Sequence, residues 1–299
     1  MSRIFEALQR SEAERSGNEL LIPPESVADL LQLSDRDTRG TRETPQDTEG
    51  LTGSLVLRPS PQPDSRLVCL VDQGSLGAEK FRLLGLRLRN LKEKRKLKKV
   101  VVTSTMPEEG KSLVAANLAL NQARSKVLKT VLVDGDLRRP TQATRFGVGE
   151  LLPGLSECLQ GERKLRDVVY RLEPSGLWFL PAGAPIDNPM ELMQSGKLVE
   201  LLDELSASFD WVIIDSPPLL PLADAAMWMK VSDGVLVVVR EGLVQSKPLK
   251  RAIEMLDKNS VLGIVVNSCT TGDNKDYYRR YSQSNAKAID TLTSNSNEI

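Results

Sequence analysis

Gly110, Lys111 and Ser112 form the first of three residue groups whose types and spacing suit phosphate chemistry. They follow an apolar segment at 100–103 and precede the helical sequence LVAANLALNQA. A glycine lets the backbone approach a phosphate, a lysine brings a cation to its oxygens, and a serine hydroxyl can bind Mg²⁺. The group matches the end of the phosphate-binding loop GxxxxGK(S/T), although Thr105 stands where that pattern has its first glycine. The pattern predicts a nucleotide site at the end of a strand.

Carboxylates follow two further apolar segments. Asp134 and Asp136 come after residues 131–133, and Asp215 comes after residues 211–214. If the chain stays extended, Asp134 and Asp136 point to the same side, at the carboxyl end of the sheet where open α/β folds bind ligands. An acid after three apolar residues is typical of the Mg²⁺ site of P-loop enzymes. The first pair favours a metal site, with the alternative that one carboxylate caps a helix and the other lies in a solvated turn.

Apolar, β-branched segments separated by helical sequence must position these groups. Continuous rather than alternating apolar residues are typical of strands that are buried on both faces, and intervening helices indicate parallel βαβ units. We therefore expect a doubly wound, mostly parallel α/β domain of the P-loop NTPase type. The predicted strands are 100–103, 131–133, 177–180, 211–214, 235–239 and 264–266.

The chain of 299 residues contains no histidine. This excludes a Ser-His-Asp triad, a Cys-His pair, a histidine zinc site and an imidazole proton shuttle. Proton transfer therefore falls to carboxylates, lysine or hydroxyl groups. The 40 basic and 40 acidic residues balance to zero net charge, which argues against nucleic acid as an obligatory partner.

The three cysteines, Cys69, Cys158 and Cys269, are far apart, so we expect buried thiols rather than a zinc or disulfide framework. The N-terminus lacks the apolar core of a signal peptide, and no apolar stretch is long enough to span a membrane, so we expect a soluble chain.

Four segments follow from the composition. The first places Ile4, Phe5 and Leu8 at helical spacing, as expected for an amphipathic helix that packs on its own domain or docks on a partner. The second is rich in polar residues, proline and glycine, and the last carries three of the four tyrosines. We predict a short amphipathic helix at 1–16, a polar linker at 17–66, a P-loop domain at 67–269 and a flexible tail at 270–299.

The chain resembles the bacterial tyrosine kinases of polysaccharide export, in the form whose kinase is separate from its membrane partner. The opening MSRIFEAL is similar to kinases encoded with exosortase-type polysaccharide systems. The motifs that carry the main resemblance are AEKFRLLGLRLRNL, TSTMPEEGKSLVAANLA, VLVDGDLRRP, GLSECLQG, LPAGAPIDNPMEL, FDWVIIDSPP, LADAAMWMKVSDGVLVVVREG and GIVVN.

The resemblance implies an ATP- and Mg²⁺-dependent kinase. It implies Walker A, Walker A′ and Walker B motifs, with Asn267 near the adenine. Within that frame, Lys111 would stabilise the transferring phosphate, and Asp134 is our candidate for orienting or deprotonating the incoming hydroxyl. Which carboxylate plays which part stays open. The expected nucleotide-binding residues are Pro107, Glu108, Glu109, Gly110, Lys111, Ser112, Leu113 and Asn267, and the expected metal ligands are Ser112, Asp136 and Asp215.

The tail sequence Asp276-Tyr277-Tyr278-Arg279-Arg280-Tyr281 resembles a reduced version of the family's tyrosine cluster. We therefore expect Tyr277, Tyr278 and Tyr281 to be phosphoacceptors, with an amphipathic tail of packed tyrosines as the alternative.

The resemblance also implies partners: an integral-membrane polysaccharide co-polymerase, a counteracting tyrosine phosphatase, and a location at the inner face of the cytoplasmic membrane through the co-polymerase. A homo-oligomeric ring is the family's form of assembly. The ring motif ExxRxxR is incomplete here, because Glu79 and Arg82 fit but Gly85 takes the place of the second arginine.

A basic cluster precedes the first predicted strand. The first interpretation is a solvated helix end, followed by contact with anionic lipid and then by DNA binding. Its members are Lys92, Lys94, Arg95, Lys96, Lys98 and Lys99.

Two other functions share these motifs. One is a partition or positioning ATPase of the ParA or MinD type, whose signature lysine is replaced here by Met106. The other is a nucleotide-gated adaptor of a polysaccharide co-polymerase that transfers no phosphate.

Overall fold

The computed structural model describes residues 55–268, except residues 63, 126, 150, 221–223 and 244. The predicted N-terminal helix, most of the predicted linker, Cys269 and the tail with Tyr277, Tyr278 and Tyr281 lie outside the described residues. Among the residues that the structure describes, no helix is long and apolar enough to cross a membrane.

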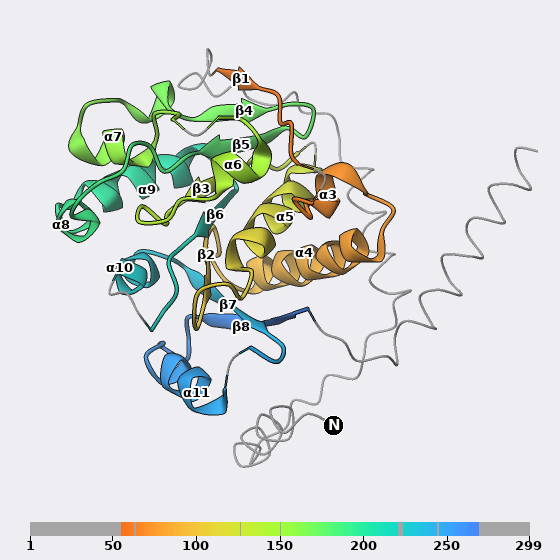
Figure 1. The fold of residues 1–299 in the computed structure, drawn as a ribbon. Helices are drawn as coiled ribbons and strands as arrows, with labels where there is room; N and C mark the ends of the chain where they lie inside the picture. Colours follow the sequence, from red (N-terminus) through yellow and green to blue (C-terminus); the bar gives the residue numbers. More distant parts are fainter. Residues whose placement is uncertain are drawn as a thin grey trace, which may run out of the picture. The chain divides into compact units, whose positions relative to one another are not determined.

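The described residues form one eight-stranded sheet (Figure 1). Every neighbouring pair of strands is parallel except β4 and β5, which are antiparallel. In sheet order the strands are β1 (Val56–Leu57), β4 (Tyr170–Leu172), β5 (Leu177–Leu180), β3 (Thr130–Asp134), β6 (Trp211–Asp215), β2 (Lys99–Ser104), β7 (Gly234–Arg240) and β8 (Val261–Asn267).

Helices cover both faces of this sheet, as Figure 1 shows: α3, α4 and α5 lie on one face, and α7, α8, α9 and α10 lie on the other. The main helix contacts run from α5 to α4 and to the central strands. The helices are α3 (Val68–Val71), α4 (Leu76–Lys94), α5 (Lys111–Ala123), α6 (Gln142–Phe146), α7 (Leu155–Gln160), α8 (Pro189–Gln194), α9 (Lys197–Ser208), α10 (Asp224–Lys230) and α11 (Ser246–Glu254), with a 3-10 turn at Leu165–Asp167.

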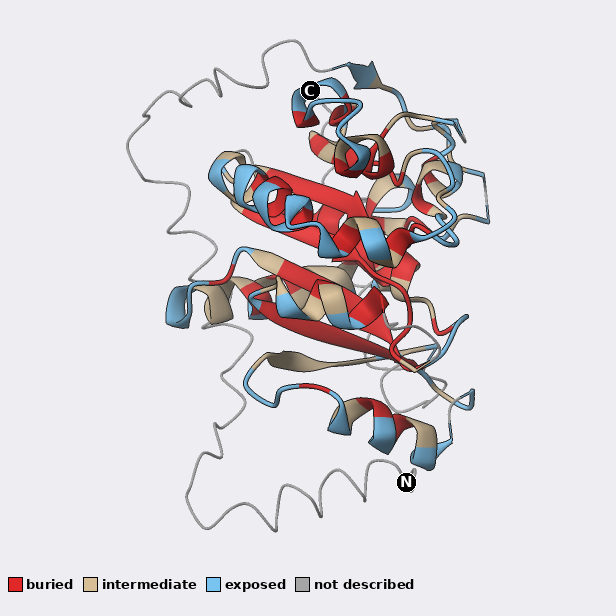
Figure 2. Ribbon diagram, turned by 90° about the vertical axis from the view of Figure 1, so that its left-hand side faces the viewer, coloured by how far each residue is buried: buried red, intermediate tan, exposed pale blue. Residues whose placement is uncertain are grey.

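The core lies in the central strands and in the helix faces turned toward them (Figure 2). Every residue of β3 and β6 is buried, as expected for parallel strands with helices on both faces. Asp134 and Asp215, the last residues of these two strands, are paired in the sheet register. The fold therefore places two carboxylates side by side at one edge of the sheet.

All six predicted strands are present, and the doubly wound fold class is confirmed. The two remaining strands, β1 and β4, were not predicted. They have two and three residues, too few to show a hydrophobic pattern. Strand β1 lies within the predicted linker at 17–66, pairs with β4, and is followed by Ser60, whose N–H donates to the carbonyl of Phe146. At least residues 55–60 of that segment therefore contact the domain.

Gly85 lies where α4 crosses α5. A Cβ atom at this position would approach the Asn121 amide nitrogen to 2.2 Å, and the Gly85 carbonyl accepts a hydrogen bond from Gln122. Position 85 is thus buried between two helices rather than displayed on the surface, whereas Glu79 and Arg82 pair with each other on a partly exposed face.

Candidate active site

The phosphate-binding loop connects β2 to α5. Gly110 is the residue before α5 and has φ +92°, a conformation that side chains rarely adopt. The other positive φ in the loop, +67°, belongs to Glu108. Thr105, which replaces the first glycine of the pattern, is fully buried and has no positive φ. The loop therefore makes its tight turn at residues 108–110.

Glu109 closes this loop from inside. Its carboxylate accepts hydrogen bonds from the N–H of Met106 at 2.6 Å and from the N–H of Arg240 at 3.3 Å. Burial raises the pKa of Glu109, while these N–H groups oppose the shift. The Asn267 amide donates to the Glu109 carbonyl at 2.9 Å and lies directly over Gly110. The ends of β7 and β8 therefore hold the loop in place.

Lys111 lies between the carboxylates of the other two motifs. Its Nζ is 3.0 Å from Oδ2 of Asp136, 3.7 Å from Oδ1 of Asp215, and 3.3 Å from the Ser112 hydroxyl. Burial lowers the pKa of Lys111, but the charges of Asp215 and Asp136 outweigh burial and the net shift is upward. Lys111 is thus a fixed cation at neutral pH.

Asp134 is buried at the end of β3. Its Oδ2 accepts hydrogen bonds from the N–H groups of Thr141, at 3.2 Å, and Gln142, at 2.9 Å, at the start of α6. Asp134 therefore caps α6 through Oδ2, as the helix-capping alternative expected, while its other oxygen takes no part in the cap. Burial and the charge of Asp215 raise the pKa of Asp134 to about 8. Its Oδ1 has no hydrogen-bond partner among the described residues.

Asp215 is fully buried at the end of β6. Burial raises the pKa of Asp215 by more than the nearby Lys111 lowers it. Oδ2 accepts a hydrogen bond of 2.8 Å from the side-chain amide of Gln142, and the same amide donates to the Ser112 carbonyl at 2.9 Å. One buried glutamine thus connects the phosphate loop to the carboxylate of the third motif.

The comparisons with known proteins agree with this geometry. A family model described as AAA domain matches residues 98–260. Over 213 residues the chain is 33% identical to the tyrosine-protein kinase YwqD of Bacillus subtilis (strain 168), a match that covers 71% of this chain and 89% of that protein. This chain belongs to the bacterial tyrosine kinase family.

Other family members match over similar ranges. The tyrosine-protein kinase CpsD of Streptococcus pneumoniae serotype 4 is 32% identical over 182 residues, which are 60% of this chain and 80% of that protein. The crystal structure of the chimerical protein CapA2B2 superimposes with a TM-score of 0.65 at 32% identity, covering 76% of this chain and all of that chain. The VpsO kinase domain has a TM-score of 0.55 at 31% identity, covering 66% and 100%. These matches favour the tyrosine kinase over the partition or positioning ATPase.

The structure brings the sequence-predicted residues of this tyrosine kinase together. Lys111 and Ser112 begin α5, and Asp136 and Asp215 lie beside Lys111. Asp134 lies within electrostatic range of all three charges. Strand β3 ends at Asp134, so Asp136 reaches the site from the turn that follows, where it also accepts from the N–H of Arg139. Residues 107–109 and Leu113 belong to the same loop and helix.

Other site residues of the bacterial tyrosine kinase were not predicted. Gln142 and Arg145 lie on α6, a five-residue helix with no recognised motif. Burial lowers the pKa of Arg145, while the charges of Asp215 and Asp134 oppose that shift, so a second cation lies within electrostatic range of these carboxylates. A further contact holds the turn that carries Asp136: the Trp228 indole donates to the Gly135 carbonyl at 3.0 Å.

The residues of this bacterial tyrosine kinase site fit a magnesium ion that a nucleotide helps to hold. Within the described ranges, no group of three or more carboxylate or cysteine side chains is placed to hold a metal alone. Mg²⁺ commonly keeps several waters and binds one or two carboxylates together with nucleotide phosphates. The Oδ1 atoms of Asp134 and Asp215 are buried without a hydrogen-bond partner in the described part of the chain, which suits a nearby cation or its water. Ser112, Asp136 and Asp215 are the groups that would hold it.

Proposed function

We propose that this chain is an ATP-dependent protein tyrosine kinase that phosphorylates its own C-terminal residues Tyr277, Tyr278 and Tyr281. The observation that carries the proposal is Lys111, held between Asp136 and Asp215 at the carboxyl ends of parallel strands. Family membership supports phosphotransfer to tyrosine. The tail contains three of the four tyrosines of the chain, which makes it the acceptor segment.

The reaction that we propose is transfer of the γ-phosphate to a tyrosine hydroxyl. A free phenol has a pKa of about 10, so it is neutral at physiological pH and needs a proton acceptor. Asp134 is our candidate for this part. With a pKa of about 8 it is mostly protonated at neutral pH in the nucleotide-free protein, so its ionised fraction, which grows as the pH rises toward 8, would accept the phenol proton. Since backbone N–H groups occupy Oδ2, the unpaired Oδ1 is the atom that would receive the proton.

The remaining groups would stabilise the negative charge of the transferring phosphate and hold the phosphate loop in position. Lys111 would neutralise the negative charge that spreads over the transferring oxygens. Ser112, Asp136 and Asp215 would hold Mg²⁺, which when bound would supply further positive charge for these oxygens. Gly110 leaves room for the phosphates beside the backbone, and Glu109 and Asn267 hold that backbone in place. We place Asn267 near the adenine as part of the same proposal.

We further propose that the kinase regulates polysaccharide polymerisation or export at the inner face of the cytoplasmic membrane. It would be recruited or activated there by the cytoplasmic segment of an integral-membrane co-polymerase and opposed by a tyrosine phosphatase. Self-association is part of this proposal. The buried position of Gly85 means that a ring of this chain would use contacts other than an arginine at that position.

The test is mass spectrometry of the full chain after incubation with Mg-ATP, with and without a co-polymerase's cytoplasmic peptide. We expect phosphate on the tail tyrosines in the natural chain and in Lys80→Met, a control at an exposed lysine of α4. We expect none in Lys111→Met, with an unchanged circular dichroism spectrum.

Other outcomes would refute parts of the proposal. Phosphate only at other residues would refute the tail assignment. ADP release without phosphotyrosine would indicate an ATPase, and nucleotide binding without either product would indicate the adaptor.

A further inference from the structure

A basic surface covers the end of the sheet opposite the phosphate loop. It surrounds a pocket of about 580 Å³ formed by the end of α4, the connection to β2, and two residues from neighbouring elements, Ser206 and Asp233. Strand β2 begins at this surface with Lys99 and leads at its other end to the phosphate loop. Six residues at about 3.3 Å each separate the two ends by roughly 20 Å. We call the cations of this pocket the basic end: Lys92, Lys94, Arg95, Lys96, Lys98 and Lys99.

The charge of the basic end is only partly compensated. Its six cations share the pocket lining with two carboxylates, Glu93 and Asp233. The Asp233 carboxylate accepts hydrogen bonds from the N–H groups of Lys98 and Lys99, and its negative charge offsets only one of the six cations. Lys99 has an ion pair of 3.4 Å with Asp203, which is itself exposed. The carboxylates at this surface are therefore fewer than the cations, and the basic end keeps a net positive charge.

Five of the six cations, all except Lys99, have no carboxylate within ion-pair distance among the described residues. Arg95 donates to the carbonyl of Asn259, and Lys98 donates to the carbonyl of Ser206. A carbonyl satisfies a donor but cancels no net charge. Lys94 and Lys96 are exposed, and neither donates a hydrogen bond to, or forms an ion pair with, a residue within the described ranges. They carry the most available positive charge on this surface.

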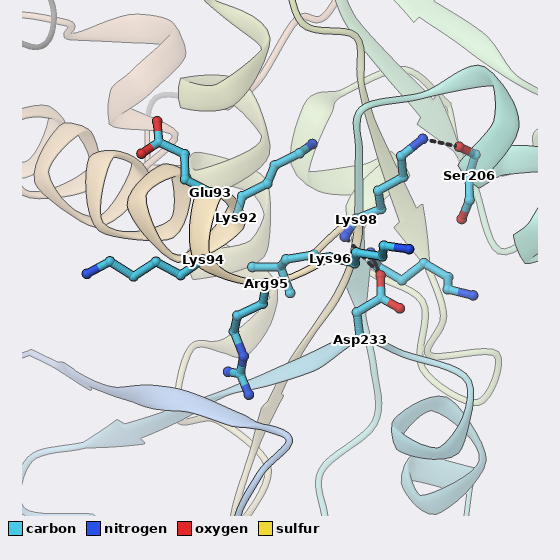
Figure 3. Close-up of a pocket in the computed structure, with 10 residues that line it drawn as sticks. Lys92, Glu93, Lys94, Arg95, Lys96, Lys98, Ser206 and Asp233 are labelled. Carbon is cyan, nitrogen blue, oxygen red and sulfur yellow. Dashed lines mark hydrogen bonds between the residues drawn. The ribbon is translucent and has the colours of Figure 1, made fainter.

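The cationic groups spread outward rather than converge. In Figure 3, Lys94 points away from Lys98, and Arg95 points in a third direction. Lys92 is anchored over the ring of Trp211, 4.4 Å from its centroid, and donates to the Asp210 carbonyl. A single small anion could meet only one or two of these groups. An extended anionic surface could meet several of them at once.

We propose that the basic end binds the anionic phospholipid head groups of a membrane surface. Clustered lysine and arginine side chains bind such surfaces by charge, within about a Debye length. Leu97, the one large apolar side chain of the lining, is buried, so the contact is electrostatic and involves no insertion of apolar groups. The location at a membrane rests on the proposed function, but the binding itself does not depend on phosphotransfer.

This contact sets an orientation. With the basic end on the membrane, the phosphate loop lies at the far end of β2 and faces away from the lipid. The nucleotide site then stays open to ATP from the aqueous side. Duplex DNA is also an extended polyanion, and the experiment below compares it directly with lipid vesicles.

The test is flotation of the full chain with vesicles of phosphatidylglycerol and phosphatidylcholine, compared with pure phosphatidylcholine vesicles. The test variant is Lys94→Gln with Lys96→Gln, which removes two cations that hold no other group. The control is Lys164→Gln with Lys230→Gln, two exposed lysines outside the pocket. Each cation lost from an anionic surface weakens binding roughly fivefold. We therefore expect about 25-fold weaker binding for the test pair, little change for the control pair, and loss of binding at high salt.

Autophosphorylation in solution is measured in parallel, and we expect it to be unchanged in both pairs. Loss of autophosphorylation would bear on the proposed kinase function, whereas loss of flotation bears only on the lipid contact. Equal binding to phosphatidylcholine, equal weakening by the control pair, or salt-independent binding would overturn the lipid proposal. So would displacement by millimolar glycerol phosphate, which would indicate a small-anion site. Tighter binding to duplex DNA than to the vesicles, lost in the test pair, would indicate nucleic acid instead.

Discussion

The side-chain amide of Gln142 donates a hydrogen bond of 2.8 Å to Oδ2 of Asp215. The same amide also donates to the carbonyl of Ser112, and both contacts are buried. The first residue of a short helix therefore fixes the distance between the phosphate loop and the carboxylate at the end of β6. A bond of this kind is suited to keeping the charges of an active site in place before the nucleotide arrives.

Gln142→Ala should impair both stability and phosphotransfer. It leaves a buried carboxylate oxygen and a buried carbonyl without their donor, which costs about 1–3 kcal/mol of unfolding free energy. Displacement of Asp215 should also lower autophosphorylation by at least about tenfold. Urea denaturation and a phosphotyrosine assay measure the two effects.

A matched control is Gln122→Ala on α5. Gln122 is equally buried, donates to the Gly85 carbonyl and accepts from Arg89, away from the phosphate loop. It should destabilise the protein to a similar degree and leave autophosphorylation of the folded fraction unchanged. Equal loss of activity in both variants would show that Gln142 acts only through stability.

The unfolding free energy should fall as the pH rises from about 4 to about 8. Asp134 has a pKa of about 8 in the folded protein and an ordinary value near 3.8 when unfolded. Between these values the native state keeps a proton that the unfolded chain has released, so the native state loses stability as the pH increases. Asp134→Asn removes this titration.

Urea denaturation of the nucleotide-free protein at several pH values measures the slope. We expect a flatter profile in Asp134→Asn, with the remaining slope due to Asp215, whose pKa is also raised and which faces Asp134, Asp136 and Lys111. Parallel profiles for the natural chain and the variant would contradict a raised pKa at Asp134.

Trp228→Phe should impair catalysis through the turn that carries Asp136. It removes the indole donor to the Gly135 carbonyl, at a net cost of about 0.5–1.5 kcal/mol. The indole ring also packs closely on Gly135, where a Cβ would lie 2.8 Å from it, so the smaller phenyl ring leaves space into which the turn can move. A shift of the turn moves Asp136 relative to Lys111, so autophosphorylation should fall by roughly tenfold.

Trp211→Phe provides the comparison. Trp211 is fully buried at the other end of β6, and its indole nitrogen donates no hydrogen bond to any described residue. Trp211→Phe removes the same side-chain atoms as Trp228→Phe, but it removes no hydrogen bond near the site. Comparable activity in the two variants would argue against a positioning part for Trp228.

Gly85→Arg, which completes the motif ExxRxxR, should destabilise the protein rather than promote assembly. The new side chain would have to displace Asn121 and separate α4 from α5, and overpacking of this kind costs about 1–3 kcal/mol. For a domain of this size, each kcal/mol lowers the melting temperature by about 2–4 °C. Lys80→Arg, at an exposed position of the same helix, should have no effect. A ring in sedimentation velocity at unchanged melting temperature would prove this prediction wrong.

Much of the fold could be predicted because parallel strands buried on both faces consist of continuous apolar residues. Strands β2, β3, β6 and β7 are of this kind. Strand β4 could not be recognised, because three residues with an exposed arginine in the middle show no pattern beyond that of a loop. Strand β1 is shorter still, and pairing with β4 rather than its own sequence makes it a strand.

The residues of the candidate active site also fall into a group that the sequence predicts and a group that it does not. Asp134 and Asp215 could be predicted because each stands directly at the end of an apolar strand, and Lys111 because it belongs to the Gly-Lys-Ser pattern between an apolar strand and a helix. Gln142 and Arg145 could not, because their helix reaches the site only through the path that the chain takes after Asp136. Buried contacts between such distant segments depend on the three-dimensional path and leave no spacing in the sequence.

The bond between Asn267 and the Glu109 carbonyl also determines where the polypeptide leaves the sheet. Strand β8 ends at Asn267, so the chain departs within hydrogen-bond distance of the phosphate loop. Tyr277 follows ten residues later, and ten residues span at most about 36 Å. If Tyr277 is an acceptor, as proposed, a covalent tether of this length would give it a high local concentration at its own active site. Modification of the tail at a rate that does not change on dilution would be the kinetic sign of that tether, whereas a rate that rises with protein concentration would mean that the acceptor comes from a second molecule.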